Sequence, residues 1–169
     1  MITAATSQDI PGLIELVNSA YRGPGSRRGW TTEADLLDGE LRTDDESMKT
    51  LMKKPDATIL KFLSGEQLTG CVYLEKQKED LYLGMLSVSP AAQSQGIGKK
   101  LLLAAEEFGK AHECLRIVMF VISLRHELID WYERHGYQRN GETKPFPKND
   151  RFGIAKQPLE FIVLEKKLG

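Results

Sequence analysis

Gly96 and Gly98 are the residues whose type and spacing most directly suggest chemistry in this sequence. They follow the apolar run 81–88 and open a helical pattern that continues to residue 108. Glycine lets the backbone approach a ligand closely, and the first N–H groups of a helix have no partner within it. The helix dipole adds partial positive charge at the same end, which favours a phosphate or pyrophosphate. The stretch 81–112 therefore predicts an anion-binding turn.

The spacing of these glycines does not fit two common phosphate-binding motifs. One residue separates Gly96 from Gly98, whereas a Walker A loop has a longer spacer before its Gly-Lys pair. The dinucleotide fingerprint needs a third glycine, and Leu101 stands at that position. An ordinary connection between a strand and a helix stays an alternative when the glycines are considered alone.

The pattern that does fit is Gln-x-x-Gly-x-Gly after an apolar strand, at residues 93–98. With the flanking text 86–102 and the block 131–137 (Trp-Tyr-Glu-Arg-His-Gly-Tyr), the chain resembles the GNAT superfamily of acetyl-CoA-dependent N-acetyltransferases. The order of elements agrees from residue 2 to residue 168, so the resemblance implies a single domain over residues 1–169. It implies an α+β fold with α/β/α layers: a mixed, mostly antiparallel sheet with a central β-α-β crossover and splayed parallel strands.

The resemblance implies a site for acetyl-CoA as cosubstrate. No metal site is expected, because a zinc site needs more ligands at tighter spacing than the three histidines offer. Backbone groups of Leu86 and Val88 would pair with the pantetheine arm, and the turn would hold the pyrophosphate. Lys99 or Lys100 would add charge near the phosphates, with a solvated helix face as the alternative. Arg125 replaces an asparagine of many family members and would reach the cofactor or lie in solvent. The expected cofactor-binding residues are Leu86, Val88, Gln93, Ser94, Gln95, Gly96, Ile97, Gly98, Lys99 and Arg125.

Tyr132 is the residue that the resemblance implies as catalytic, acting as a general acid. An amine attacks the thioester carbonyl, and the sulfur leaves better when it is protonated. A phenol with a pKa of about 10 keeps its proton at neutral pH and can donate it. The alternative is a core aromatic residue on an amphipathic helix.

The general base stays unassigned from the sequence. Some family members supply a carboxylate on the strand before the turn, where this chain has Tyr82. Glu75 and Glu33 are possible substitutes, and a base that acts through ordered water is an equal alternative.

The acceptor site is expected in the segments 22–41 and 142–153. Arg28, beside Arg27, would bind a carboxylate, Trp30 would pack on the substrate, and Glu33 would meet an ammonium group. This combination suits an amino acid or a similar small zwitterion. Solvated loop charges and an anchoring tryptophan are the alternative for the first segment. For the second, the apolar residues form either a rim of the site or a rigid proline loop.

The elements that would position these residues follow from the hydrophobic periodicity. Strands are expected at 2–6, 58–63, 68–75, 81–88, 115–121 and 159–165, with a further extended segment that starts at Tyr137. Helices are expected at 7–21, 31–41, 43–52, 101–108 and 127–135, and loops at 22–29 and 142–157. The strand 115–121 is expected to lie parallel to 81–88 and to be buried on both faces. The strand 159–165 is expected at an exposed edge, which makes a homodimer possible.

The overall composition is that of an ordinary globular protein, with 41% hydrophobic and 28% charged residues. A net charge of -1 gives no basic field for nucleic acid, and no apolar run is long enough to span a membrane. The two cysteines, Cys71 and Cys114, lie in separate apolar runs, and the N-terminus lacks the features of a signal peptide. We therefore expect a cytoplasmic protein with no nucleic-acid or membrane partner.

The sequence favours an enzyme that moves an acetyl group from acetyl-CoA to a primary amine. The expected acceptor is a small molecule, such as an amino acid derivative, which attacks directly in a ternary complex. Neither cysteine is expected to form a covalent intermediate, since each lies in an apolar run. Two alternatives remain at this point: a non-catalytic sensor that binds acyl-CoA, and a protein or peptide N-acetyltransferase.

Overall fold

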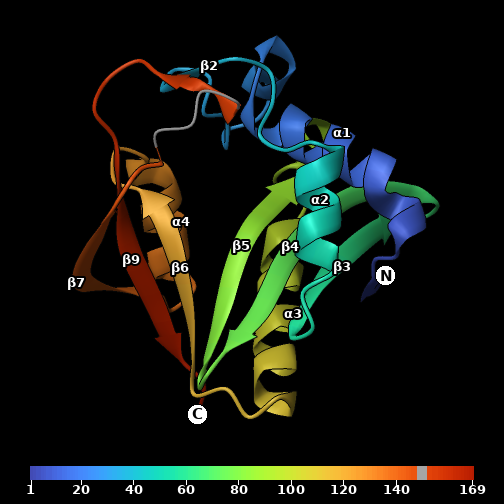
Figure 1. Cartoon of the computed structure of the whole chain (residues 1–169), viewed down its shortest axis with the longest axis vertical. Coiled ribbons are helices and arrows are strands. Elements are labelled where there is room, and N and C mark those ends of the chain that lie inside the picture. Colours follow the sequence, from blue (N-terminus) through green and yellow to red (C-terminus); the bar gives the residue numbers. More distant parts are fainter. Residues whose placement is uncertain (148–151) are drawn as a thin grey trace.

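A seven-stranded sheet crosses the computed structural model, which describes residues 1–147 and 152–169 (Figure 1). Its strands, in spatial order, are β1 (Ile2–Ala4), β3 (Ala57–Ser64), β4 (Gln67–Gln77), β5 (Asp80–Val88), β6 (Arg116–Ile122), β9 (Glu160–Lys167) and β7 (Gln138–Pro145). Only β5 and β6 pair in parallel, and the other neighbours are antiparallel. A separate small sheet pairs β2 (Leu37–Asp38) with β8 (Ile154–Ala155). The expected mixed, mostly antiparallel sheet is confirmed.

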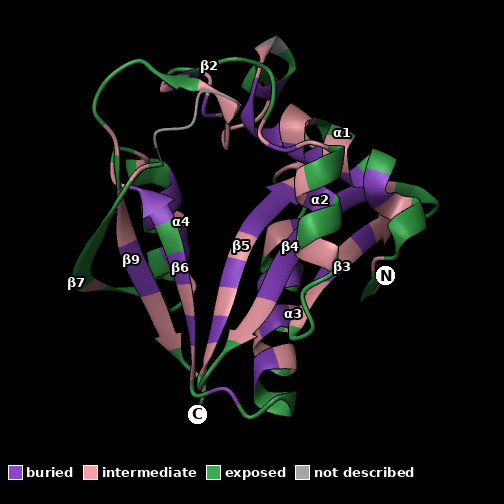
Figure 2. Cartoon of the chain, in the orientation of Figure 1, coloured by how far each residue is buried: buried purple, intermediate pink, exposed green. Residues whose placement is uncertain are grey.

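Helices cover both faces of this sheet. On one face lie α1 (Ile10–Tyr21) and α2 (Asp45–Met52), and on the other α3 (Ile97–Ala111) and α4 (His126–Arg134). Because successive side chains of a strand alternate between faces, β4 sends Val72 and Leu74 to one core and Tyr73 to the other. Figure 2 shows the buried residues following the strands and the inner helix faces. The expected α/β/α layers and the β5-α3-β6 crossover are confirmed.

The two parallel strands at the centre of the sheet separate soon after they begin. Residues Asp80–Tyr82 of β5 pair with Arg116–Val118 of β6, and beyond them the strands diverge into a V-shaped opening (Figure 1). Met85 has a φ of +55°, and the register between β4 and β5 shifts beside it. A bulge of this kind bends the strand that carries it. The expected splay of the parallel strands is present, and β5 bends within the diverging part.

The prediction of a helix at 31–41 is wrong. The segment forms turns and then β2, with the Glu33 backbone N–H bonded to the Tyr21 carbonyl at 2.7 Å. Helix propensity yields here to tertiary contacts, since Glu33 and Leu37 are both buried against other elements. The Thr32 hydroxyl accepts a bond from the Ala34 N–H, which offers the backbone a local alternative to a helix.

The loop expected at 142–157 is wrong in part. Strand β7 continues to Pro145, and β8 begins at Ile154, while residues 148–151 lie outside the described part of the chain. Within the described ranges, strand β7 is the last strand of the sheet and pairs on one side only. An edge strand tolerates charged residues and a proline, which is why this segment resembles a loop in sequence.

Two expectations about the C-terminal half of the sheet are also wrong. Strand β9 lies between β6 and β7, so it is not an edge and cannot support a homodimer through that edge. Strand β6 is not buried on both faces, because Phe120 is 40% exposed where the strand borders the V-shaped opening. None of the helices in the described ranges is long and apolar enough to cross a membrane.

Candidate active site

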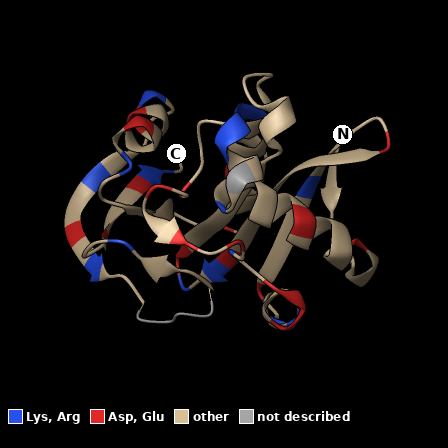
Figure 3. Cartoon of the chain, turned by 90° about the horizontal axis from the view of Figure 1, so that it is seen from above, with Lys and Arg blue, Asp and Glu red and all other residues tan. Residues whose placement is uncertain are grey.

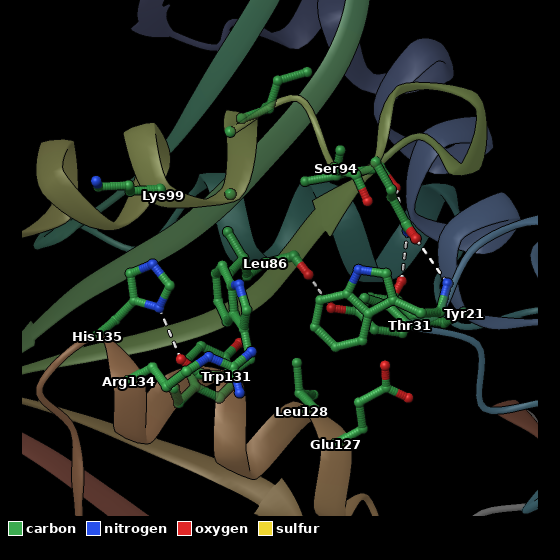
Figure 4. Close-up of a pocket in the computed structure, with 17 residues that line it drawn as sticks. Tyr21, Thr31, Leu86, Ser94, Lys99, Glu127, Leu128, Trp131, Arg134 and His135 are labelled. Atoms are coloured by element: carbon green, nitrogen blue, oxygen red, sulfur yellow. Dashed lines mark hydrogen bonds between the residues drawn. The ribbon is translucent and has the colours of Figure 1, made fainter.

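Two cavities meet in the opening between β5 and β6. The first, the turn cavity, has a volume of about 500 Å³ and extends from the turn before α3 to helix α4 (Figure 4). The second, the arginine cavity, has a volume of about 300 Å³ and lies between β5, β6 and the segments around Arg22 and Phe152. Both cavities are lined by Tyr21, Leu86, Leu128 and Tyr132. These shared residues mark the place where ligands in the two cavities would touch.

The turn before α3 has the backbone geometry of an anion cradle. Ser94 and Gly96 have φ angles of +70° and +80°, and helix α3 starts at Ile97. The first bond that closes a helical turn runs from the Lys100 N–H to the Gly96 carbonyl, so the preceding N–H groups are free for a ligand. Such a left-handed turn at a helix N-terminus directs several N–H groups toward one point.

The side chain of Gln93 joins this turn to the N-terminal part of the chain. Its amide oxygen accepts the Trp30 N–H at 2.8 Å, and its amide nitrogen donates to the Thr31 hydroxyl and the Val88 carbonyl. Trp30 is thereby held in the turn cavity, with its ring centroid 6.0 Å from that of Trp131. The backbone of Gln93 belongs to the cradle, while its side chain positions the wall of the cavity.

Helix α4 forms the opposite wall of the turn cavity. A β-carbon on Gly98 would lie 3.1 Å from the Trp131 ring, so any side chain there would force that ring to shift. Glycine thus allows the close approach of α3 and α4. Lys99, Arg134 and His135 also line the cavity (Figure 4) and bring basic side chains to it. Sequence reasoning missed Arg134 and His135, although both stand inside the block 131–137 that it singled out.

The structure gathers most of the expected cofactor residues around the turn cavity. The residues that line it are Leu86, Val88, Gln93, Ser94, Gly96, Ile97, Gly98 and Lys99. Gln95 and Arg125 do not line it, and Arg125 lies in the arginine cavity instead. Of the expected acceptor residues, Trp30 lies in the turn cavity and Glu33 in the arginine cavity, while Arg28 is exposed and lines neither.

Tyr132 is buried where the two cavities meet. Its ring packs edge-on against Trp131 and Tyr137, with centroid distances of 5.1 and 5.8 Å. Burial and the nearby Tyr21 raise the pKa of Tyr132 well above the ordinary tyrosine value, and the charge of Arg125 opposes this shift. Among the described residues, the Tyr132 hydroxyl has no hydrogen-bond partner. The phenol therefore keeps its proton and is free to donate it.

Tyr21, which sequence reasoning also missed, lies beside Tyr132 in both cavities. Its hydroxyl donates to the Leu86 carbonyl, and the Arg125 guanidinium lies 5.5 Å from its ring centroid. The carbonyls of Leu86 and Val88 thus each have a side-chain partner already. Each oxygen keeps a second lone pair, so the backbone of β5 can still accept a bond from a ligand.

Glu33 is buried between two arginines on the wall of the arginine cavity. Its Oε1 lies 3.0 Å from Arg22 Nη2, and its Oε2 lies 3.1 Å from Arg125 Nη1. Arg22 also donates to the carbonyls of Leu41 and Phe152, and Arg125 to that of Thr31. Burial lowers the pKa of Arg22, and the Glu33 carboxylate opposes that shift. The expected contact of Glu33 with a substrate ammonium competes with these two ion pairs.

Glu75 lies outside the two cavities described above. It lines a third cavity of about 470 Å³, which adjoins the arginine cavity along Arg42 and Gly84. Its carboxylate accepts bonds from Tyr73, Gln77 and Lys54, and its pKa is lowered, chiefly by the bond from Tyr73. A carboxylate held ionised in this way is a weak base, so the structure does not single out Glu75 for deprotonation of an amine.

A sequence model of the acetyltransferase (GNAT) family matches residues 13–137 of the chain. Among solved structures, the ribosomal-protein-S18-alanine N-acetyltransferase from Escherichia coli has a TM-score of 0.75 at 12% identity, covering 100% of this chain and 94% of that chain. The ribosomal-protein-alanine N-acetyltransferase from Brucella melitensis has a TM-score of 0.74 at 17% identity, covering 99% of both chains. The Salmonella typhimurium protein yncA, solved with acetyl-CoA, has a TM-score of 0.68 at 17% identity, covering 100% of this chain and 94% of that chain. No curated protein sequence matches the chain.

Proposed function

Because this chain belongs to the GNAT family of acetyltransferases, we propose that it transfers the acetyl group of acetyl-CoA directly to a primary amine of a small molecule, such as an amino acid derivative. Membership of the family makes it an acetyl-CoA-dependent N-acetyltransferase. The observation that carries the proposal is that two cavities meet at Tyr132. The turn cavity contains the anion cradle, and the arginine cavity does not. Donor and acceptor would enter from opposite sides and react between β5 and α4.

On the donor side, the turn cavity would hold acetyl-CoA. The N–H groups of the turn 93–99 would bind the pyrophosphate, and Leu86 and Val88 would face the pantetheine arm. Lys99 and Arg134 would add positive charge around the phosphates, and His135 lies beside them on the cavity wall. The side chain of Gln95 is exposed and does not line the turn cavity, so only its backbone N–H belongs to this donor site. Arg125 lines the arginine cavity and is not included.

The chemistry proposed at the junction needs one proton donor. The amine nitrogen forms a bond to the thioester carbonyl carbon, the carbon–sulfur bond breaks, and the leaving thiolate takes the proton of the Tyr132 hydroxyl. The tyrosinate is then reprotonated from solvent, and the proton of the amine leaves to solvent or through water. No carboxylate is assigned as base, since Glu33 and Glu75 both have several hydrogen-bond partners.

Direct transfer is favoured over a thioester intermediate on the enzyme. Burial raises the pKa of the Cys71 thiol to about 12, and that of Cys114 is raised as well. Neither cysteine lines the turn cavity or the arginine cavity. A thiol that stays protonated and inaccessible is a poor nucleophile.

We place the protein in the cytoplasm because both thiols are free, and we treat residues 1–169 as one catalytic domain.

The experiment that tests the proposal is a screen for acetyl-CoA consumption with amino acids, polyamines, aminoglycosides and peptides. Turnover with a free small amine and intersecting initial-velocity lines support direct transfer in a ternary complex. Turnover with peptides alone would instead support a protein or peptide acetyltransferase. Binding of acetyl-CoA without turnover on any amine would favour a sensor that lacks catalysis.

A change at Gly98 tests the donor side. Gly98→Val would push a side chain into the Trp131 ring and the turn cavity, because a β-carbon there already lies 3.1 Å from Trp131. We expect the Kd for acetyl-CoA, measured by calorimetry, to rise about tenfold, in line with the ordinary cost of overpacking. Gly25→Val is the matched control, since a β-carbon at Gly25 meets nothing within 4 Å. An unchanged Kd in folded Gly98→Val protein would contradict the assignment of the turn cavity to acetyl-CoA.

A further inference from the structure

The arginine cavity is lined by more arginines than its one carboxylate can neutralise. Its charged lining among the described residues consists of Arg22, Arg42, Arg125 and Glu33. Glu33 neutralises one positive charge and holds Arg22 and Arg125 in place. Across the rest of the molecule, acidic and basic residues are interspersed (Figure 3), and the net charge is -1. The excess of arginine in this cavity is therefore a local feature.

Arg42 is the arginine of this set that is free to bind a ligand. Within the part of the chain that the structure describes, its guanidinium has no hydrogen-bond or ion-pair partner. Its backbone N–H is fixed to the Asn18 side chain at 2.5 Å, and the next N–H, of Thr43, bonds to the same oxygen at 2.9 Å. The chain is thus anchored at Arg42 while the five N–H donors of its side chain stay available.

The surroundings of Arg42 locate its charge beside the reaction centre. Arg42 and Tyr21 line the arginine cavity together, and Arg42 and Tyr82 line the third cavity that adjoins it. Tyr21 is one of the residues shared by the two cavities. An anionic group bound at Arg42 would therefore lie in the same cavity as an amine directed at Tyr132.

Aromatic rings form the other wall of the arginine cavity. Phe120 lies 5.6 Å from Tyr82 and 6.2 Å from Phe161, and Phe146 lies 5.2 Å from Phe161, measured between ring centroids. Phe120 is 40% exposed although it lies in the middle of a strand. Exposed aromatic surface of this kind, next to a few polar groups that fix orientation, is typical of a small-molecule site.

We propose that the acceptor is an aromatic or other bulky apolar α-amino acid, whose carboxylate binds Arg42 and whose side chain packs on Phe120 and Phe161. The inference deepens the proposed acetyl transfer and rests on it. A carboxylate matches the planar donors of a guanidinium, whereas a polyamine or an aminoglycoside would bring like charge to an arginine-rich site. The cavity of about 300 Å³ has room for one amino acid and little more.

The test compares phenylalanine with 2-phenylethylamine, which keeps the ring and the amine but lacks the carboxylate. We expect kcat/KM for phenylalanine to exceed that for 2-phenylethylamine by about 30-fold, the usual effect of a bidentate charged contact. In Arg42→Met this preference should vanish, with thermal stability unchanged because no side-chain partner among the described residues is left unpaired. Because the same two amines are compared in each protein, differences in their basicity cancel.

Two further variants complete the experiment. Arg139→Met removes an arginine on β7 that pairs with Glu133 at 3.9 Å, away from the cavities, and should keep the full preference. Phe120→Ala should lower kcat/KM for the acceptor phenylalanine about tenfold more than kcat/KM for the acceptor alanine. The reason is that the substitution removes the wall that packs on the phenylalanine ring. The combination separates loss of the carboxylate contact from loss of the apolar contact.

The possible failures are distinguishable. A preference for spermidine over phenylalanine, or a phenylalanine preference that survives in Arg42→Met, would overturn the inference and leave acetyl transfer to small amines intact. No consumption of acetyl-CoA with any amine, in protein that binds acetyl-CoA, would overturn the proposed function and this inference together.

Discussion

Replacing Tyr132 by phenylalanine is expected to lower kcat about 100-fold, while the Kd for acetyl-CoA changes little. The change removes the only atom of Tyr132 that can protonate the leaving sulfur and keeps the ring that lines both cavities. A general acid acts in the transition state rather than in binding, so its loss appears in kcat. Single-turnover kinetics with the best amine of the screen and calorimetry with acetyl-CoA measure the two quantities separately.

The pKa of Tyr132 fixes the pH dependence of this step. The acid must carry its proton, and burial holds its pKa well above the ordinary value, so the group stays protonated throughout the neutral and mildly alkaline range. We therefore expect no fall in kcat from this residue up to about pH 10, the ordinary tyrosine value. Any rise in rate between neutral pH and that limit would reflect deprotonation of the amine.

Tyr137→Phe is the matched control for this change. Tyr137 packs against Tyr132, and its buried hydroxyl has no hydrogen-bond partner among the described residues. Removing that hydroxyl should leave kcat unchanged and stability equal or slightly higher. If Tyr132→Phe keeps its activity and Tyr21→Phe loses it, the proton donor is Tyr21, whose hydroxyl now bonds to the Leu86 carbonyl.

Replacing Glu33 by glutamine is expected to destabilise the fold by about 3 kcal/mol. The carboxylate is buried, and it neutralises Arg22 and Arg125, whose side chains are 3% and 8% exposed. Breaking a buried ion pair from one side leaves its partner charged and dehydrated, which typically costs about 3–5 kcal/mol. Glutamine keeps one acceptor oxygen, so we expect the lower end of that range. Urea unfolding followed by circular dichroism measures the difference.

Asp35→Asn is the control for the Glu33 substitution. Asp35 makes the same kind of ion pair, with Arg27 at 2.8 Å, but its side chain is 78% exposed. An exposed pair contributes roughly 1 kcal/mol or less, so this amide substitution should hardly change the unfolding midpoint. Equal losses in the free energy of unfolding for the two substitutions would contradict this prediction. They would show that burying Arg22, Glu33 and Arg125 adds nothing to stability beyond an exposed ion pair.

The donor half of the candidate site was predictable because it is built from consecutive residues. A strand, the turn 93–98 and a helix follow each other directly, and the backbone of such a unit is set by glycine, by apolar periodicity and by helix ends. The same holds for Tyr132, which stands within a short helical block. Local sequence was sufficient wherever the functional groups belong to one strand–turn–helix unit.

The secondary-structure predictions are wrong where contacts between residues distant in sequence decide the conformation or the exposure of a segment. The segment 31–41 has helix signals, but Glu33 pairs with an arginine 92 positions later, and this contact cannot be seen in a local pattern. Strand β9 resembles an edge in sequence, because β7, which lies outside it in the sheet, is polar and ends in a proline. In each case a neighbour in space, distant in sequence, changed the conformation or the exposure of the segment.

By itself, the sequence determined the layered fold, the turn at Gly96 and Gly98, and the helix that carries Tyr132. Only the tertiary structure decided which arginines are paired within the protein and which are available to bind a ligand. Arg22 and Arg125 are held by Glu33, and Arg28 is exposed. Arg42 lines the arginine cavity, and its side chain has no partner among the described residues. The physical reason is that an arginine's role depends on which carboxylates and carbonyls the fold brings within hydrogen-bond distance. Composition and spacing do not contain those distances.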